Sequence, residues 1–375
     1  MFPLLDAPIR DAGEQFGGSL PGRIEQDCRT GPPTRPARLM RAAVLILNYN
    51  SWRDTLECLE SVFRSDYPIE TIVVCDNGST DGSVERILDW VDGRVDVCLE
   101  KDHPLRELSH PPVPKPLPAK VLNRSEAEAG VTADPEGDAR LVLIRNGDNL
   151  GFAGGNNVGL RYLLKRRGWD CVWMLNPDTA VRKDALRHLC EGLSRDAKAG
   201  MCGSTLLYYS APETVQALGG ATYNKWLALP RHIGAGTAAT LPVDAEAVLR
   251  RMSYVYGASM LVSRDFVETV GLLNEERFLY FEEIDWAIRG RDRFRLAYAP
   301  ESVVYHREGG SLGSGRTKSW TSDYYFLRNR IRITRDFASY ALPTVYLAIL
   351  VAALRRASRR QWDRAFMAAK LLWTA

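Results

Sequence analysis

Short apolar runs alternate with segments of helical periodicity along most of this chain. The runs 42–47 and 71–75 predict strands buried on both faces, because each is apolar almost throughout and closed by polar turn residues. The stretches 52–64 and 84–91 predict the helices that follow, with Leu56, Leu59 and Phe63 on one face of the first. Two strand–loop–helix units in succession predict an α/β protein with a parallel, doubly wound sheet.

The same alternation continues to about residue 337, with one interruption. Further strands are predicted at 95–99, 141–144, 171–175, 260–262, 295–298 and 303–305, and further helices at 158–167, 183–195, 264–270, 278–289 and 321–337. Residues 102–139 are Pro-rich and then acidic, which predicts a surface insertion, partly polyproline and partly disordered. Residues 1–40 are rich in Gly, Pro and Arg and predict a flexible leader. The predicted domains are therefore a catalytic unit at 41–320 and a helical region at 321–375.

The composition is that of an ordinary soluble protein, with 45% hydrophobic and 25% charged residues among 375. A formal net charge of +3 is too small to indicate nucleic acid as a partner. Seven cysteines without any Cys-x-x-Cys spacing argue against a disulfide framework or a zinc site, and favour a reducing, cytoplasmic setting. Residues 1–40 contain no apolar core of signal-peptide length.

The stretch 171–178 brings a carboxylate to the end of a buried strand. The strand stops at Asn176-Pro177-Asp178, because proline cannot continue a hydrogen-bond ladder. In open α/β sheets ligands collect at the carboxyl edge, where Asp178 can hold a divalent cation and, through it, phosphate oxygens. Such a metal needs a second protein ligand, and His306, at the end of another short strand, is the candidate. An Asx turn that only closes the strand, with a structural histidine elsewhere, is the alternative.

Two loops have features of ligand-binding turns. Asp76 ends the strand 71–75 and opens an Asp-Asn-Gly-Ser turn, where its carboxylate can accept from a base while backbone N–H groups face a ligand. A tight turn with Asp81 capping the next helix is the alternative. The Gly-rich loop 149–157 opens a helix and can approach phosphate or sugar closely, although it lacks the dinucleotide and Walker spacings. The alternative there is a loop that needs positive φ at several positions.

Segment 278–289 places three carboxylates among aromatic residues. Glu282, Glu283 and Asp285 fall within four positions, and like charges at a partly apolar site raise a carboxyl pKa, as a general base requires. At helical spacing Glu282 and Asp285 also reach Arg289, so one of these carboxylates can be an ion-pair partner instead.

The order of these motifs resembles that of family-2 glycosyltransferases of the GT-A fold, particularly bacterial rhamnosyltransferase-like members. The matching stretches are 46–50, 73–83, 149–159, 175–178, 278–289 and 324–330. The resemblance implies a Rossmann-like nucleotide-diphospho-sugar transferase fold, with a mixed, mainly parallel sheet and C-terminal helices. It also implies inverting transfer of a sugar from a nucleotide-diphosphate donor to an acceptor hydroxyl.

The resemblance also implies roles for individual residues. Asp76 would bind the nucleobase, and the other donor-binding positions would be Asn48, Asn50, Asn149, Gly155, Asn156, Asn176 and Asp178. Asp178 would hold Mg²⁺ or Mn²⁺ on the diphosphate, with His306 as second ligand, and Glu283 would be the catalytic base.

This chain departs from the family pattern at two of these positions. The first Asp of the Asp-x-Asp motif is Asn176 here, which leaves fewer anionic ligands for the metal. Glu283 stands where Asp is usual, so Asp285 stays a candidate for the base.

Residues 337–354 carry no charge after Asp336 and precede the Arg355-Arg356 and Arg359-Arg360 pairs. This pattern favours a helix lying on the inner face of the cell membrane over one that spans it. A helix pair that packs on the catalytic domain or forms a homo-oligomer is the alternative.

Three functions remain open from the sequence. The leading one is transfer of rhamnose from dTDP-rhamnose to a lipid-linked or polysaccharide acceptor in cell-wall or surface glycan assembly. The donor can instead be UDP-linked galactose, galactofuranose or N-acetylglucosamine, because no residue reads the sugar. The third is a catalytically silent nucleotide-sugar-binding subunit at the membrane.

Overall fold

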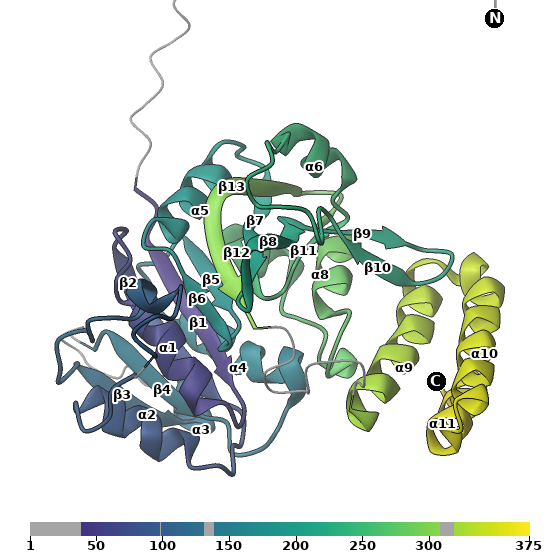
Figure 1. The fold of residues 1–375 in the computed structure, drawn as a ribbon, viewed down its shortest axis with the longest axis horizontal. Helices are drawn as coiled ribbons and strands as arrows, with labels where there is room; N and C mark the ends of the chain where they lie inside the picture. The colour runs from purple at the N-terminus through teal and green to yellow at the C-terminus, as the bar shows by residue number, and fades with distance from the viewer. Residues whose placement is uncertain (1–38, 98, 131–138, 308–318) are drawn as a thin grey trace, which may run out of the picture. The chain divides into compact units, whose positions relative to one another are not determined.

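A ten-stranded mixed sheet forms the centre of the fold, and helices cover both of its faces (Figure 1). The computed structural model describes residues 39–97, 99–130, 139–307 and 319–375, so the predicted leader at 1–40 lies almost wholly outside the described residues. The sheet order is β3-β4-β2-β1-β5-β12-β7-β13-β6, with β8 paired to β7, and a second sheet has the order β10-β9-β11. Pairs among β1 to β5 are parallel, whereas β12 is antiparallel to both of its neighbours. The predicted α/β class is therefore confirmed.

Most helices and strands follow the predicted alternation, but the predicted loop 149–157 is helical from Gly151 onward, and the predicted helix 278–289 begins only at Glu282. The strands are β1 (Ala42–Asn48), β2 (Ile69–Asp76), β3 (Ala119–Asn123), β4 (Leu141–Arg145), β5 (Cys171–Leu175), β6 (Thr179–Val181), β7 (Ala199–Tyr208), β8 (Ala211–Leu218), β9 (Gly220–Asn224), β10 (Leu229–His232), β11 (Tyr254–Val255), β12 (Ser259–Ser263) and β13 (Arg295–His306). The helices are α1 (Trp52–Val62), α2 (Ser83–Val91), α3 (Arg124–Ala129), α4 (Gly151–Lys165), α5 (Ala185–Ser194), α6 (Ala245–Arg251), α7 (Arg264–Val270), α8 (Glu282–Gly290), α9 (Trp320–Phe337), α10 (Leu342–Ser358) and α11 (Trp362–Thr374), with short 3₁₀ turns at Arg106–Leu108, Glu275–Arg277 and Ser339–Ala341.

The central strands are apolar on both faces because each face meets a different helical layer. Along β1, Val44 and Ile46 belong to the core under α1, α2 and α5, whereas Ala43 and Leu45 belong to the core under α4, α7 and α8. A strand buried on both sides needs an unbroken apolar run, which explains the pattern in the sequence.

Strand β1 lies at the point where the strand order reverses. From it the chain builds β2 and β4 on one side and β5 on the other, all parallel to it. The carboxyl ends of these strands therefore meet at one edge, the usual position of a ligand site in a doubly wound sheet.

The predicted surface insertion contributes to the sheet. Ala119–Asn123 is an edge strand paired to β4, whereas 95–97 and 99, expected to be a strand, are not in one. Only Leu122 of this strand is buried, so its sequence has too little apolar content to reveal it. The preceding loop is tied down by Glu60, which accepts from the backbone N–H of Val113 at 2.8 Å and from Lys115 Nζ at 2.8 Å.

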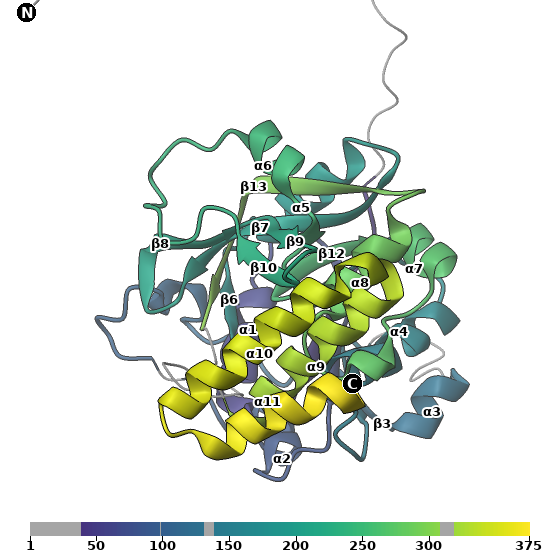
Figure 2. The ribbon, with the colours of Figure 1, turned by 90° about the vertical axis from the view of Figure 1, so that its right-hand side faces the viewer.

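Helices α9, α10 and α11 pack against one another at the C-terminal end, with α10 and α11 side by side (Figure 2). Their shared core includes Leu327, Ile331, Val345, Ile349 and Met367. Ser339–Ser358 is long and apolar enough to cross a bilayer, with a mean hydropathy of 1.3, and 22% of its most apolar window is buried. One side of α10 is therefore packed and the other is open.

We expect Lys115→Met to lower the free energy of unfolding by about 3 kcal/mol, because it leaves Glu60 buried without its cation. Urea denaturation measures the change. Lys101→Met, at an exposed position in the same loop, is the matched control and should change stability by less than about 0.5 kcal/mol. Equal stabilities of the two variants would show that the loop is not anchored through this pair.

Candidate active site

A cavity of about 640 Å³ opens at the carboxyl edge of the central strands. Its lining comes from the ends of β1, β2 and β5, the first turn of α4, the segment before β12, and the residues around the start of α8. Asn149, Asn176, Asp178 and Glu283 are the predicted site residues that line it. These residues lie far apart in the sequence and are brought together by the sheet.

Asn48 and Asp76 are register partners at the ends of β1 and β2. Asn48 Nδ2 donates to Asp76 Oδ1 at 2.7 Å, and the backbone N–H of Ser79 donates to Asp76 Oδ2 at 3.1 Å. Asn50 accepts from the N–H of Thr80 and has a φ of 49°. These contacts hold the turn after β2 rigidly, and neither Asn48, Asn50 nor Asp76 is among the residues that line the cavity.

Asn77 connects this turn to the Gly-rich loop. Its Nδ2 donates to Asn149 Oδ1 at 3.0 Å and to the carbonyl of Gly151 at 3.2 Å. Asn149 and Gly151 face the cavity, but Gly155 and Asn156 lie inside α4 and do not line it. A Cβ at Gly155 would come within 2.5 Å of a Leu47 methyl group, so this glycine allows α4 to pack closely on β1. Asn156 donates to its own helix, at the carbonyl of Phe152.

Asp178 and His306 meet at the ends of neighbouring strands. Asp178 Oδ1 lies 3.2 Å from His306 Nε2, and both side chains are more than nine-tenths buried. His306 Nδ1 lies 2.9 Å from Gln216 Oε1, which favours the tautomer with the proton on Nδ1. The lone pair of Nε2 then faces Asp178 Oδ1, a buried oxygen for which the described residues provide no hydrogen-bond donor. Two acceptors facing each other fit a divalent cation, so the residues present suit the implied metal.

No group of three or more His, Cys, Asp or Glu side chains that could hold a metal occurs among the described residues. A cation at Asp178 and His306 therefore needs further oxygen ligands from a bound molecule or water. Diphosphate oxygens are ligands that Mg²⁺ and Mn²⁺ prefer.

Glu282 and Glu283 begin α8 at the rim of the cavity. Burial raises the pKa of Glu283 to about 7. Burial, followed by repulsion from Glu283, holds the pKa of Glu282 well above its usual range, and no partner for Glu282 Oε1 occurs in the part of the chain that the structure describes. A carboxyl with a pKa near neutrality is suited to accept a proton from a ligand in the cavity.

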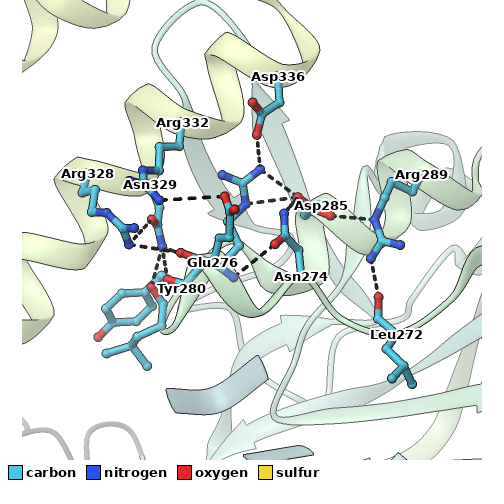
Figure 3. A network of polar contacts seen from close by, with 12 residues as sticks. Leu272, Asn274, Glu276, Tyr280, Asp285, Arg289, Arg328, Asn329, Arg332 and Asp336 are labelled. Atoms are coloured by element: carbon cyan, nitrogen blue, oxygen red, sulfur yellow. Dashed lines mark hydrogen bonds and ion pairs between the residues drawn. The ribbon is translucent and has the colours of Figure 1, made fainter. Parts of the chain in front are cut away.

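Asp285 has a different environment from the two glutamates (Figure 3). Its Oδ2 accepts from Arg277 Nη2 at 2.8 Å and from Asn274 Nδ2 at 3.2 Å, and its Oδ1 accepts from Arg289 Nε at 2.7 Å. Arg277 also binds Asp336 of α9. Asp285 is 1% exposed and does not line the cavity. It is therefore a buried ion-pair partner of Arg277 and Arg289.

The segment before α8 has an unusual backbone. Phe278, Tyr280 and Phe281 have φ values of 58°, 69° and 74°, which side-chain-bearing residues seldom adopt. Asn329 of α9 holds this turn, since its Nδ2 lies within hydrogen-bond distance of the carbonyls of Arg277, Leu279 and Tyr280 at 2.6, 2.9 and 3.0 Å (Figure 3). Asn329 therefore stabilises the turn that leads into Glu282 and Glu283.

Sequence reasoning missed several residues of the site. Tyr49 and Tyr256 line the cavity, and Tyr256 stacks edge-on against His306 with ring centres 6.0 Å apart. Asn77 and Asn329 organise the two loops around the cavity. Asn77 directly follows Asp76 in the turn that the sequence singled out, whereas Tyr256 lies in a stretch without periodicity and carries no signal of its own.

Comparisons with known proteins agree with this geometry. Residues 43–103 match the family model of glycosyl transferase family 2. Low-salt glycan biosynthesis hexosyltransferase Agl10 of Haloferax volcanii is 28% identical over 211 residues, which cover 56% of this chain and 65% of that protein. N-acetylglucosaminyl-diphospho-decaprenol L-rhamnosyltransferase of Mycobacterium tuberculosis is 25% identical over 243 residues, which cover 58% of this chain and 76% of that protein.

Among solved structures, GalNAc-T7 with UDP, GalNAc and Mn²⁺ is similar with a TM-score of 0.53 and 14% identity, over 85% of this chain and 51% of that one. This likeness concerns the fold alone. The chain thus spans just under two thirds of the Haloferax protein and about half of the solved chain. The fold is therefore that of the GT-A type of glycosyltransferase. The match of residues 43–103 is to the family whose motif order the sequence resembles.

We expect Asn329→Ala to lower the free energy of unfolding by about 3 kcal/mol, because three carbonyls of a part-buried turn lose their donor. Chemical denaturation measures the loss. Arg332→Ala, one turn further along α9 at a part-exposed position, is the control and should cost less than about 1 kcal/mol. A wild-type value for Asn329→Ala would exclude a structural role for these hydrogen bonds.

Proposed function

We propose that this protein is an inverting glycosyltransferase that transfers a sugar from a nucleotide-diphosphate donor to an acceptor hydroxyl. One observation carries the proposal. The same cavity is lined by a carboxyl suited to accept a proton, Glu283, and by Asp178, which forms with the buried His306 behind it a pair suited to a divalent cation. Sugar transfer from a diphosphate needs both, because a hydroxyl must lose its proton while negative charge builds on the leaving group.

In this mechanism the acceptor oxygen attacks the anomeric carbon and its proton passes to the Glu283 carboxylate. The bond from the anomeric carbon to the diphosphate oxygen breaks, and the diphosphate leaves with the electron pair. Asp178 and His306 would hold the Mg²⁺ or Mn²⁺, whose charge offsets that of the leaving diphosphate. Asp285 is assigned no step, since Arg277 and Arg289 neutralise its charge.

The donor base would lie against the turn after β2, where Asp76 is held by Asn48 and Ser79. Asn149 and Asn176 line the cavity and would contact the sugar-phosphate region, whereas Asn50, Gly155 and Asn156 would shape the loops around it. Rhamnose from dTDP-rhamnose remains the leading donor, in keeping with the name of the mycobacterial relative. UDP-linked galactose, galactofuranose and N-acetylglucosamine are the other donors to test.

We propose a lipid-linked or polysaccharide acceptor in cell-wall or surface glycan assembly, at the inner face of the cell membrane. The names of both relatives support this class: one acts in glycan biosynthesis and the other on a decaprenol-linked diphosphate sugar. The apolar, partly open helix α10 supports a position of the C-terminal region near the membrane surface, where such an acceptor would be found.

Calorimetric titration with a panel of nucleotide sugars tests the donor site. We expect one donor to bind more tightly with Mn²⁺ than without, and Asp178→Ala or His306→Ala to remove at least about tenfold of that gain, because each removes a direct ligand. Glu283→Gln is the control and should keep donor affinity. Metal-independent binding in the wild type would refute the metal site, and no binding at all would refute the donor site.

Replacing the base tests the chemical step. We expect Glu283→Gln to lower kcat by about 10²-fold to 10⁴-fold with little change in the KM for the donor. The base must be ionised, so wild-type kcat/KM should rise as pH increases through about 7 and then level off. Transfer of radiolabelled sugar at several pH values measures both effects.

Glu276→Gln, at an exposed position just before the segment, is the matched control and should be as active as wild type. Asp285→Asn should lose stability, because it leaves Arg277 and Arg289 with one charge fewer to pair. Full activity of Glu283→Gln, with loss of activity in a folded Asp285→Asn, would reverse the assignment of the base. Donor binding without turnover in the wild type would favour the silent subunit instead.

A further inference from the structure

A second cavity, of about 770 Å³, lies among the C-terminal helices and is separate from the active-site cavity. The tip of the β9–β10 hairpin forms one wall, and α9, α10 and the start of α11 form the others. Five arginines line it together with a single carboxylate, Asp323: they are Arg330, Arg355, Arg356, Arg359 and Arg364. We refer to it as the arginine cavity.

The positive charge of the arginine cavity is only partly balanced. Arg356 binds both oxygens of Asp323, and Arg364 lies 3.8 Å from the same carboxylate. Arg330 donates to the carbonyl of Leu227, a neutral acceptor. Within the described part of the chain, the guanidinium groups of Arg355 and Arg359 make no hydrogen bond or ion pair. The carboxylate of Asp323 therefore pairs with two of the five guanidinium groups, and an anion would complete the site.

The pKa of Arg330 shows that its charged form is disfavoured in this cavity. The pKa of Arg330 is lowered to about 10, chiefly by burial; Tyr223 opposes this effect and the charge of Arg356 adds to it. Holding like charges together at a partly buried position is unfavourable unless a counter-charge is bound. Guanidinium groups bind phosphate through paired N–H donors, so phosphate is the anion that they suit best.

The surroundings of the arginine cavity identify the source of the phosphate. Leu347 and Val351 of α10 line the cavity and are also exposed. Helices α10 and α11 expose further large apolar side chains. These are Leu350, Leu354, Trp362, Phe366 and Trp373, the last two with 72% and 91% of their surface exposed. A soluble anion would leave this apolar surface in water. A bilayer interface instead offers phosphates beside acyl chains and takes up aromatic side chains at its boundary.

We propose that the arginine cavity binds the phosphate of an anionic membrane phospholipid while the exposed side chains of α10 and α11 enter the bilayer interface. Neighbouring positions of α9 border both cavities, since Thr321 lines the active-site cavity and Asp323 lines the arginine cavity. Lipid binding would therefore bring the active-site cavity close to the headgroup layer. This consequence rests on the proposed function, whereas the lipid site itself does not.

Co-sedimentation of the full chain with vesicles tests the proposal. Vesicles of phosphatidylcholine are compared with vesicles that also contain phosphatidylglycerol, and we expect clearly tighter binding to the second kind. The double variant Arg355→Gln, Arg359→Gln should lose about thirtyfold in affinity for the anionic vesicles. Both side chains are exposed and make no contact that the fold needs, so the variant should fold like wild type.

The double variant Arg250→Gln, Arg251→Gln on α6 removes the same net charge away from the cavity and should lose less than about threefold. Equal losses in the two double variants would overturn the proposal in favour of unspecific attraction. Equal binding of wild type to both kinds of vesicle would also overturn it. Full displacement of the protein from vesicles by millimolar inorganic phosphate would assign the cavity to a free anion.

Transfer assays separate this inference from the proposed function. The Arg355→Gln, Arg359→Gln variant should bind the nucleotide-sugar donor like wild type, because both residues lie outside the active-site cavity. A raised KM for a lipid-linked acceptor with unchanged vesicle binding would show that the cavity reads the acceptor and would overturn the phospholipid assignment. Normal vesicle binding without any sugar transfer would refute the proposed function and leave the lipid site standing.

Discussion

The ion pair between Arg277 and Asp285 is the contact on which much of this structure depends. Each side chain is 1% exposed, and burying two charges is tolerable only when they are paired and their remaining hydrogen-bonding atoms are satisfied. Asn274, Arg289 and Asp336 meet that requirement from three different segments. The pair thereby fixes α8 against α9, and α9 in turn carries the two C-terminal helices.

Much of the fold was predictable because it follows from local pattern. Buried parallel strands need unbroken apolar runs, and the polar residue that ends such a run falls at the edge of the sheet, which is how Asp178 and His306 were placed together. The edge strand Ala119–Asn123 escaped prediction because it buries one side chain and follows a proline-rich stretch. The hydrophobic pattern of a sequence gives little signal for a strand that buries almost none of its side chains.

The kind of site was predictable from the sequence, but the environment of each of its residues was not. Sequence spacing could not separate Glu283 from Asp285, because both sit in one acidic turn and the difference arises from Arg277, Asn274 and Asp336, which the fold supplies. Gly155 was expected at a ligand, yet its missing side chain makes room for Leu47. A glycine that admits a substrate and a glycine that admits a neighbouring strand look alike in a sequence.

The left-handed backbone of Phe278, Tyr280 and Phe281 has a consequence for how this protein can change. Each such residue costs of order 1–3 kcal/mol, so glycine at these positions would relieve strain that the rest of the fold now sustains. The same replacement would loosen the turn that orients Glu283. Phe281 is only 3% exposed and Phe278 stacks on Tyr325, so losing either ring would cost at least as much as the strain that glycine relieves. The turn is therefore constrained from both sides, and variants selected for heat tolerance should retain these aromatic residues.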